Sequence, residues 1–285
     1  MCYHSWTNKK MIKQLRDLLN NEFDPAFAQR AAFIFHTVEK ERPKKILDAG
    51  CGRGFYVSSL TEFNFIKEIH GIEVNSAYLQ IAQQNCTDKR IILQRGSINN
   101  LPYKEATFDF VICSEVLEHL SDDKQALSEL TRVLKPGGAL CMTVPCSNFP
   151  FLWDPLNWLL MKIFNTHINQ DIWWLAGIWA DHKRLYTKQQ LVSLLKNKFI
   201  ILNSMFLTKW CWPFSHFLLY GIGKNIVQRT SFMHIDRFSK TRTANKPSLL
   251  AKLFTFPTRY LDRKMYAGPA VNIVVLARKM NIKMY

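Results

Sequence analysis

The sequence predicts an α/β protein with a doubly wound, mostly parallel sheet, and three observations support this class. The strand-like run 45–49 leads into three glycines at alternate positions, 50, 52 and 54, after which apolar residues follow helical spacing. A second strand-like run, 69–73, ends in the carboxylate of Glu73 about nineteen residues after the last glycine, where such sheets place a ribose ligand. Strand-like and helix-like segments then alternate up to residue 144.

The individual elements follow from caps, breakers and apolar periodicity. Asp24-Pro25 is typical of a helix start and Asn75-Ser76 of an N-cap, because Asp and Asn side chains accept hydrogen bonds from the first free backbone N–H groups. Pro136-Gly137-Gly138 is expected to end the helix that begins at Asp122. The expected strands cover residues 45–49, 69–73, 90–94, 108–113, 139–144, 199–202 and 271–276.

Composition favours a folded protein in a reducing compartment. The chain has 285 residues, and its hydrophobic content of 48% is ample for a core. Its seven cysteines form no C-x-x-C pair and no metal-ligand spacing with histidine, so we expect free thiols, no metal site and a cytoplasmic location. Residues 1–19 lack the apolar core of a signal peptide, and the run 210–223 is shorter than the ~20 apolar residues of a membrane span.

The basic charge is concentrated in the second half of the chain. Residues 1–150 hold 18 Lys and Arg against 17 Asp and Glu, whereas residues 151–285 hold 20 against 5. Seven of the eight tryptophans also lie in the second half, between Trp153 and Trp212. This distribution suggests a cofactor module joined to a part that meets an anionic surface.

The glycine turn by itself permits two classes of nucleotide-binding enzyme. Its spacing, G-x-G-x-G, is one residue shorter than the dinucleotide fingerprint G-x-G-x-x-G of dehydrogenases. The later landmarks decide between the classes. They are Leu101-Pro102-Tyr103 ahead of Phe108-Asp109, the run Glu115-Val116-Leu117-Glu118-His119-Leu120, and Leu134-Lys135-Pro136-Gly137-Gly138.

With these landmarks, residues 25–145 resemble the class I S-adenosylmethionine-dependent methyltransferases, in particular the small-molecule branch that includes the ubiquinone and menaquinone biosynthesis enzymes. The resemblance implies a Rossmann-like methyltransferase fold with a seven-stranded sheet whose last strand is antiparallel. It also implies S-adenosyl-L-methionine as the cofactor. The protein's main task in such a reaction is to align the reactants and exclude water.

The resemblance further implies a role for each residue around the turn. Asp48 and the glycines Gly50, Gly52 and Gly54 would hold the methionine part and the sulfonium side of the cofactor, and Glu73 would hold the ribose. The remaining contacts would come from Ser97 and Ile98 beside adenine and from Ser114 and Glu115 on the floor near the methyl group. Ser97 stands where the family usually has an aspartate, so its hydrogen bond to adenine would lack charge assistance.

The domain organisation is predicted from these landmarks and from composition. Residues 22–146 are expected to form the cofactor-binding core, and residues 183–208 with 270–280 are expected to complete it. Residues 147–182, rich in Trp and Phe, are expected to form an inserted aromatic lid. Residues 209–269 form a basic, aromatic insertion that the short family pattern does not contain.

Two histidines are candidates for the general base that a hydroxyl acceptor needs. His119 follows the fourth strand, but it also sits in an apolar run and is compatible with a capping or packing role. His182 lies at the end of the lid beside Asp181, which would fix its tautomer, although His182, Arg184 and Tyr186 are equally compatible with anchoring the lid. Cys146 suggests a cytosine C5-methyltransferase nucleophile only weakly, because no second motif supports it.

The basic insertion leaves two kinds of partner open besides a small hydrophobic acceptor. Its cations suit RNA phosphates or anionic lipid headgroups, and its aromatic residues favour a peripheral membrane surface. A third interpretation is that the aromatic residues fill a substrate-domain core. We therefore expect methylation of a small hydrophobic or lipid-like acceptor at oxygen, with carbon and nitrogen ranked below it. RNA methylation is the alternative, and a non-catalytic cofactor-binding module is third. The cations are Arg229, Arg237, Lys240, Arg242, Lys246, Lys252, Arg259, Arg263 and Lys264, and the aromatic and apolar residues are Trp210, Trp212, Phe214, Phe217, Leu218, Leu219 and Tyr220.

Overall fold

The computed structural model describes residues 12–172, 175–219, 249–262 and 268–281. The chain divides into two compact units. The first unit draws on residues 1–33, 145–187 and 206–273, and the second on residues 34–144, 188–205 and 274–285. All nine predicted cofactor residues belong to the second unit.

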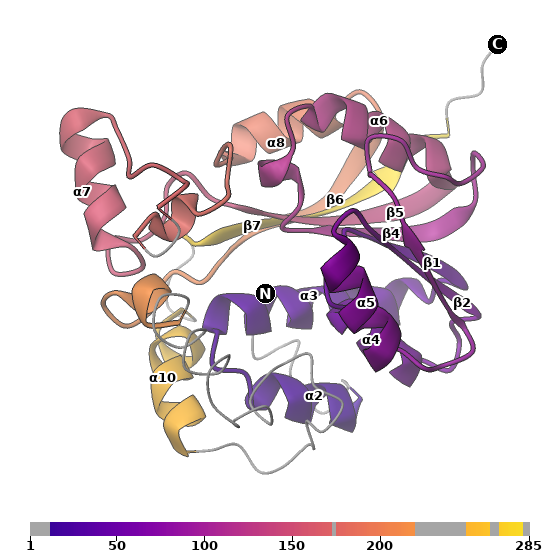
Figure 1. Cartoon of the computed structure of the whole chain (residues 1–285), viewed down its shortest axis with the longest axis horizontal. Coiled ribbons are helices and arrows are strands. Elements are labelled where there is room, and N and C mark those ends of the chain that lie inside the picture. Colours follow the sequence, from indigo (N-terminus) through magenta and orange to yellow (C-terminus); the bar gives the residue numbers. More distant parts are fainter. Residues whose placement is uncertain (1–11, 173–174, 220–248, 263–267, 282–285) are drawn as a thin grey trace. The chain divides into compact units, whose positions relative to one another are not determined.

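A seven-stranded mixed sheet is the framework of the second unit, with the order β3-β2-β1-β4-β5-β7-β6 (Figure 1). β1 pairs in parallel with both β2 and β4, so the order of strands reverses at β1. The carboxyl ends of parallel strands meet at one edge, and such a reversal is where doubly wound sheets bind ligands. The predicted fold class is confirmed. The strands are β1 (Lys45–Ala49), β2 (Glu68–Glu73), β3 (Ile91–Arg95), β4 (Phe108–Ser114), β5 (Leu134–Pro145), β6 (Phe199–Leu207) and β7 (Asn272–Lys279).

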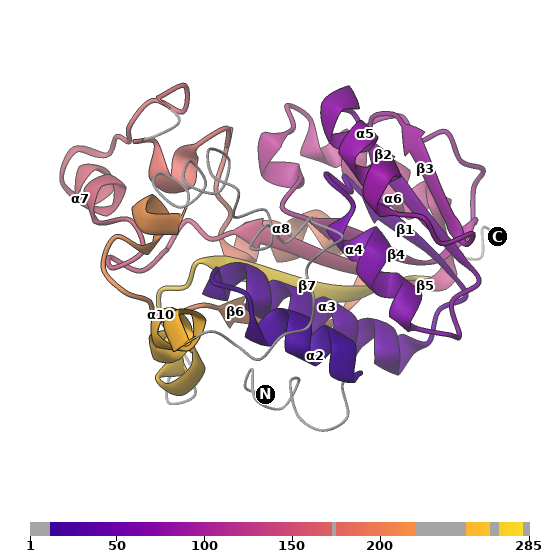
Figure 2. The same cartoon turned by 60° about the horizontal axis from the view of Figure 1, so that its bottom comes forward.

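Helices cover both faces of this sheet. Figure 1 shows α6 and α8 on one face and α3 and α4 on the other, while α5 packs on β2 and β3 (Figure 2). The central strands are apolar because both of their faces are covered, and Phe108, Phe110 and Val111 of β4 are fully buried. The helices are α3 (Pro25–Glu41), α4 (Phe55–Ser59), α5 (Ser76–Asn85), α6 (Asp123–Val133) and α8 (Lys188–Leu195), with short 3₁₀ turns η1 (Leu60–Glu62) and η2 (Leu117–His119).

The predicted helix starts are confirmed by their capping hydrogen bonds. Asp24 accepts from the backbone N–H of Ala26 at 2.9 Å, and Pro25 occupies the first position of α3. The Asn75 side chain accepts from the N–H groups of Ala77 and Tyr78 at the start of α5. Each side chain satisfies donors that a helix leaves free at its first turn.

The stretch Pro136-Gly137-Gly138 corrects one expectation. It is not a turn between α6 and the fifth strand, because α6 ends at Val133 and β5 already begins at Leu134. Phe108 of β4 pairs with Leu134 whereas Phe110 pairs with Ala139, so β5 bulges between these two contacts. Gly137 has a φ of 74°, a conformation that the bulge requires and that glycine adopts without strain.

The first unit has a small core of its own. α2 (Lys13–Asn20), the beginning of α3, α7 (Pro155–Phe164), the 3₁₀ turn η3 (Gly177–Trp179) and α10 (Leu249–Tyr260) belong to it. Gln29 of α3 accepts from the Thr208 backbone N–H at 2.7 Å and donates to Asp262 at 3.1 Å, which ties three distant segments together. The buried apolar cluster consists of Ala26, Phe149, Trp153, Ile178, Leu185, Cys211 and Val271.

The tryptophans of the first unit divide between core and surface. Trp153 is buried in the apolar cluster, so the core interpretation holds for this residue, whereas Trp212 is 44% exposed. Among the predicted partner residues, Tyr220, Arg229, Arg237, Lys240, Arg242, Lys246, Arg263 and Lys264 lie outside the described residues. Within the described part of the chain, no helix has both the length and the apolar character needed to cross a membrane.

Candidate active site

The three glycines after β1 are all left-handed, but they serve different purposes. Their φ values are 85°, 53° and 87° for Gly50, Gly52 and Gly54. A Cβ on Gly50 would stand 2.5 Å from a Val116 methyl group, and one on Gly54 would stand 2.8 Å from the Cys86 sulfur. A Cβ on Gly52 would meet no atom within 4 Å. Gly50 and Gly54 therefore permit close packing, whereas Gly52 borders open space that a ligand can enter.

Asp48, the fourth residue of β1, is a buried carboxyl group. It is 1% exposed, and burial, together with the nearby charge of Glu73, raises its pKa to about 8. Its Oδ2 atom is buried and accepts no hydrogen bond from the residues that the structure describes. A buried carboxylate without a partner is energetically costly. A cationic ligand would pair with the ionised carboxylate and lower its pKa, so this site favours such a ligand.

Glu73, at the end of β2, is held beside the glycine turn. Its Oε2 accepts from the Gly52 backbone N–H at 2.9 Å and its Oε1 accepts from the Asn75 N–H at 2.8 Å. Each carboxylate oxygen has two lone pairs, so both can still accept from ligand hydroxyl groups. The structure thus brings Asp48, Gly52 and Glu73 together at the ends of β1 and β2, as the resemblance implies.

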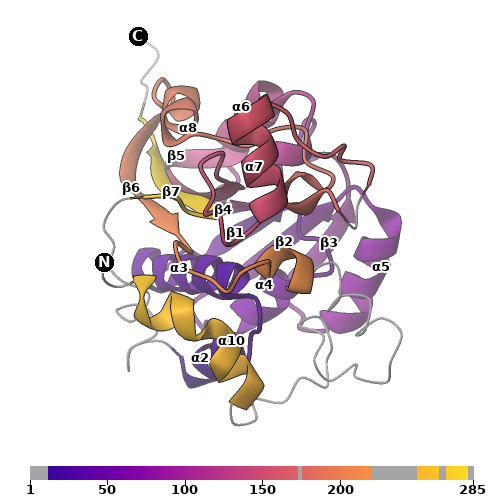
Figure 3. The same cartoon turned by 90° about the vertical axis from the view of Figure 1, so that its left-hand side faces the viewer.

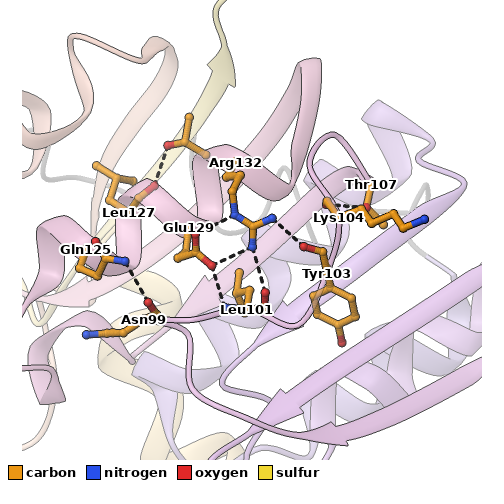
Figure 4. Close-up of polar contacts among 10 residues, drawn as sticks. Asn99, Leu101, Tyr103, Lys104, Thr107, Gln125, Leu127, Glu129 and Arg132 are labelled. Atoms are coloured by element: carbon orange, nitrogen blue, oxygen red, sulfur yellow. Dashed lines mark hydrogen bonds and ion pairs between the residues drawn. The ribbon is translucent and has the colours of Figure 1, made fainter.

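Ser97 and Ile98 begin a loop between β3 and β4 that is fastened to α6. Ile98 is buried and Ser97 is exposed, with its Oγ accepting from the Asn99 N–H at 3.2 Å. Arg132 of α6 donates to the carbonyl oxygens of Leu101 at 2.9 Å and Tyr103 at 2.6 Å (Figure 4). Arg132 was not among the residues predicted for the site, because its contacts with the Leu101-Pro102-Tyr103 landmark form between segments that are distant in the sequence.

Glu129 completes this attachment of the loop. Its two carboxylate oxygens bind the Arg132 guanidinium at 2.7 and 2.8 Å, and one of them also accepts from the Leu101 N–H at 2.7 Å (Figure 4). The carboxylate thereby neutralises Arg132 and holds the Leu101 N–H, while Arg132 holds the Leu101 carbonyl oxygen. These contacts fix the loop that carries Ser97 and Ile98 to the rigid face of α6.

Ser114, the last residue of β4, and Glu115, which follows it, belong to a row of hydrogen-bonded side chains. Thr143 of β5 donates to Glu115 Oε1 at 2.8 Å and lies 2.9 Å from Ser114 Oγ, which lies 3.4 Å from the Tyr56 hydroxyl. Because a hydroxyl group has one proton, Thr143 must accept from Ser114, and Ser114 from Tyr56. Glu115 has a φ of 55°, so backbone conformation and Thr143 together orient its carboxylate. Thr143 is the one hydroxyl side chain in the apolar strand segment 139–144, a signal that was available in the sequence.

The two candidate bases lie in different units, and their surroundings differ. His119 closes η2 and its side chain is 41% exposed, with Nε2 3.9 Å from Glu118 Oε1. His182 belongs to the first unit, and its Nδ1 lies 2.5 Å from the Ile178 carbonyl oxygen. A proton on Nδ1 donates to that carbonyl and leaves Nε2 of the neutral ring as an acceptor. Asp181, expected to fix this tautomer, is exposed with a φ of 60°, and the Ile178 carbonyl makes the contact described for Nδ1.

Cys146 has none of the features of a thiolate nucleophile. Its side chain is 2% exposed, and burial raises the pKa of its thiol. The uncharged thiol is therefore the stable form at neutral pH, whereas a nucleophilic cysteine needs a lowered pKa. This geometry favours the interpretation of Cys146 as a small buried hydrophobic residue.

The arrangement around β1 and β2 fits the cofactor that the resemblance implies. Asp48 offers an unpartnered oxygen to a cationic amino group, Glu73 offers lone pairs to ribose hydroxyls, and Gly52 leaves space above the turn. The loop at 97–98 lies beyond the end of the neighbouring β3. These side chains can bind and orient such a ligand.

Comparison with known proteins agrees with this geometry. Residues 47–142 match a protein family described as "Methyltransferase domain". A demethylmenaquinone methyltransferase of Lactiplantibacillus plantarum is 35% identical over 124 residues, which are 41% of this chain and 52% of that protein. A ubiquinone biosynthesis O-methyltransferase of Idiomarina loihiensis is 26% identical over 168 residues, 58% of this chain and 65% of that protein.

Other relatives carry different names. A tRNA (carboxymethyluridine(34)-5-O)-methyltransferase of Arabidopsis thaliana is 39% identical over 102 residues, 35% of this chain and 23% of that protein. The chain thus spans about half the length of the demethylmenaquinone methyltransferase and less than two thirds of each of these relatives. The solved structure of the YcgJ protein from Bacillus subtilis has a TM-score of 0.51 and 17% identity, covering 86% of this chain and 97% of that one, which is a likeness of fold.

Proposed function

We propose that this chain, whose residues 47–142 form a class I S-adenosyl-L-methionine-dependent methyltransferase domain, methylates an oxygen atom of a small hydrophobic or lipid-like acceptor. The cofactor of the domain is S-adenosyl-L-methionine. The observation that carries the proposal is the set formed by Asp48, Gly52 and Glu73, because its unpartnered carboxylate oxygen, open turn and held carboxylate suit this cofactor.

The protein's part in the reaction follows from this set. When bound, S-adenosyl-L-methionine supplies an electrophilic methyl group on a sulfonium. Asp48 would hold the amino group, Glu73 the ribose, and the anchored loop at 97–98 the adenine. The row from Tyr56 to Glu115 would form a fixed polar floor at the ends of β4 and β5. Fixed groups contribute by aligning the acceptor for in-line displacement.

The nature of the acceptor is supported by the relatives. One is named a demethylmenaquinone methyltransferase and another a ubiquinone biosynthesis O-methyltransferase, and only the second of these two names specifies methylation at oxygen. Quinone precursors are hydrophobic small molecules that carry ring hydroxyl groups. An acceptor of this chemical class agrees with the apolar character of the second half of the chain.

RNA methylation is the second candidate. It is favoured by the relative named for tRNA methylation and by residues 208–269, which hold eleven Lys and Arg against two Asp. Ser114-Glu115-Val116-Leu117 occupies the place at the end of β4 where enzymes that methylate exocyclic nitrogens carry an Asn/Asp-Pro-Pro-Tyr/Phe motif, which counts against RNA methylation at such nitrogens. The second candidate is therefore RNA methylation at oxygen, which the name of the tRNA relative specifies.

Transfer of an isotope-labelled methyl group distinguishes the candidates. The purified full-length chain is incubated with deuteriomethyl-labelled cofactor and either a lipid extract or total RNA, and the products are analysed by mass spectrometry. We expect a labelled lipid-soluble product, absent with the Glu73→Ala variant. Label only in RNA would establish the second candidate, and label in neither fraction despite binding of S-adenosylhomocysteine would indicate a non-catalytic module. In cells, loss of the gene should remove one methyl unit from the same product.

A further inference from the structure

Helix α10 exposes a stripe of apolar side chains. Thr255 and Thr258 are each 2% exposed, whereas Leu253, Phe256 and Tyr260 are 54%, 48% and 52% exposed. Residues three and four apart share a face of a helix, so these three apolar side chains form one outward stripe. A helix of a water-soluble domain usually buries such a stripe and exposes its polar residues. The arrangement in α10 is the reverse.

Hydrogen bonds hold α10 in this orientation. The Thr258 hydroxyl donates to the Trp210 carbonyl oxygen at 2.7 Å, and Arg259 donates to the Asn20 carbonyl oxygen at 3.1 Å. Rotating the helix to bury its apolar stripe would break these contacts and place the stripe where the hydroxyl groups lie. These hydrogen bonds therefore fix the outward orientation of the apolar stripe in the first unit.

The segment 212–217 extends the apolar surface of α10. The Trp212 indole N–H donates to the Leu253 carbonyl oxygen at 3.0 Å, which places this side chain against the helix. Trp212 itself is 44% exposed, and Phe214 and Phe217 are 54% and 41% exposed. Tryptophan with a bonded N–H and an open ring surface is typical of interfaces between water and apolar phases.

Helix α7 packs Trp158 and Met161 against the buried cluster, but it too carries apolar side chains on its outer face. Its one fully buried polar residue, Asn157, binds Asp154 and the Ala176 carbonyl through its amide nitrogen and the Ile168 N–H through its oxygen. Meanwhile Leu156, Leu159 and Ile163, at helical spacing, are 42%, 42% and 65% exposed. Figures 1 and 3 show α7, the segment around 210–218 and α10 one after another along the same side of the first unit.

We propose that this apolar face docks on an anionic lipid surface. The apolar face consists of Leu156, Leu159, Ile163, Trp212, Phe214, Leu253, Phe256 and Tyr260. Docking on lipid is independent of the acceptor that the enzyme methylates.

Charge identifies lipid as the occupant. Residues 208–269 supply five of the eight side chains of the face, and in sequence they hold eleven Lys and Arg against two Asp. Three of these cations, Lys209, Lys252 and Arg259, belong to the described residues. One of the two aspartates, Asp262, is held by the N–H groups of Lys209 and Trp210 and so is turned to the interior. Lys252 of α10 and Lys162 of α7 are exposed beside the apolar side chains. Apolar and aromatic side chains flanked by cations are the pattern of proteins that lie on anionic membranes.

Vesicle sedimentation with matched variants tests the proposal. The full-length chain is mixed with phosphatidylcholine vesicles that contain about 30% phosphatidylglycerol, and with pure phosphatidylcholine vesicles. We expect binding to the mixed vesicles that weakens with salt and with loss of the anionic lipid. Phe256→Asp and Leu159→Asp should each lower the affinity by about tenfold or more, because a charge replaces an inserted apolar group. Ile200→Asp, at a 56% exposed position of β6 in the second unit, should bind as the parent does.

A second measurement reports the depth of Trp212. Vesicles with brominated acyl chains should quench the tryptophan fluorescence, and Trp212→Phe should remove part of that quenching. Equal vesicle binding by the Phe256→Asp and parent proteins would overturn the proposal. So would a concentration-dependent dimer that Phe256→Asp abolishes without any vesicle binding, because the face would then serve a second copy of the chain.

Discussion

The backbone N–H of Gly52 donates to Glu73 Oε2 at 2.9 Å, so the glycine turn after β1 and the acid at the end of β2 form one unit. The hydrogen bond fixes the carboxylate beside the space that a Cβ on Gly52 would enter without touching another atom. Asp48, two residues before the first glycine of the turn, adds a buried carboxyl group to the same edge. The ends of two neighbouring parallel strands thus bring three of the predicted cofactor residues together.

Substitution of the glycines should separate packing from ligand binding. Gly50→Ala should lower the free energy of unfolding, because its Cβ would stand 2.5 Å from Val116 in addition to the strain of a φ of 85°. Gly52→Ala adds only the backbone strain of roughly 1 kcal/mol, but its methyl group occupies the ligand space. Thermal unfolding and calorimetry with S-adenosylhomocysteine measure the two effects. Loss of binding only in Gly50→Ala would place the ligand elsewhere.

The raised pKa of Asp48 predicts a pH dependence of cofactor binding. A cationic amino group prefers the ionised carboxylate, so affinity for S-adenosylhomocysteine should rise with pH towards about 8, the pKa of the buried group. Binding should release a proton in this range, which calorimetry detects as a dependence of the heat on the buffer. Asp48→Asn should bind more weakly and lose this pH dependence. An unchanged profile in the variant would assign the titration to another group.

The raised pKa of Asp48 also predicts how the stability of the ligand-free protein depends on pH. Its pKa is raised from 3.8 in the unfolded chain to about 8 in the folded one, so the folded state retains a proton that the unfolded state has lost. The stability contributed by that proton is complete below about pH 3.8 and is lost as pH rises towards 8. Urea unfolding at pH 5 and pH 8 should show a smaller decline for Asp48→Asn than for the parent.

Loss of the Arg132 attachment should loosen the loop that begins with Ser97 and Ile98. Arg132→Lys keeps the charge but cannot reach the Leu101 and Tyr103 carbonyl oxygens and Glu129 together, and it should cost about 1–3 kcal/mol. Binding of S-adenosylhomocysteine should weaken, and limited proteolysis should cleave within residues 97–107. Arg90→Lys is the matched control, because Arg90 donates to the Thr61, Phe63 and Ile66 carbonyl oxygens. Equal effects on binding would show that only general stability is involved.

The sequence predicted the fold because its signals are local. The strand–turn–helix at 45–60 and the caps Asp24 and Asn75 act through neighbouring residues. Glu73 was predicted from its spacing after the glycine turn, although it binds Gly52 across two strands. The prediction for Gly137-Gly138 was wrong because such glycines are found both at helix ends and in β-bulges. Only the pairing of β5 with β4 distinguishes the two. The functions of Gly50 and Arg132 depend on Val116 and on the loop at 101–103, which are distant in the sequence. The outward stripes of α7 and α10 could not be predicted from the sequence. Apolar periodicity shows that a helix has an apolar face, but it does not show whether that face points to the core or to solvent.

The last prediction concerns His182 as general base. A hydroxyl acceptor must lose a proton as its oxygen attacks, and with Nδ1 bound to the Ile178 carbonyl oxygen, Nε2 of the neutral ring is an acceptor. His182→Ala should therefore lower kcat by about 100-fold or more while cofactor binding persists. The parent's kcat should fall on acidification, because a protonated imidazole cannot accept a proton, whereas the variant's should not.

His167→Ala is the matched control for this variant. His167 also lies in the first unit, and its Nδ1 contacts the Ile168 carbonyl oxygen at 2.8 Å, while its ring stacks on Trp179. Its loss should leave the pH profile of kcat unchanged. If His182→Ala retains the parent's kcat, His182 serves with Arg184 and Tyr186 as an anchor of its segment, and either His119 or alignment alone must account for the reaction. A parallel loss of kcat and of unfolding free energy, without a change in the pH profile, would lead to the same conclusion.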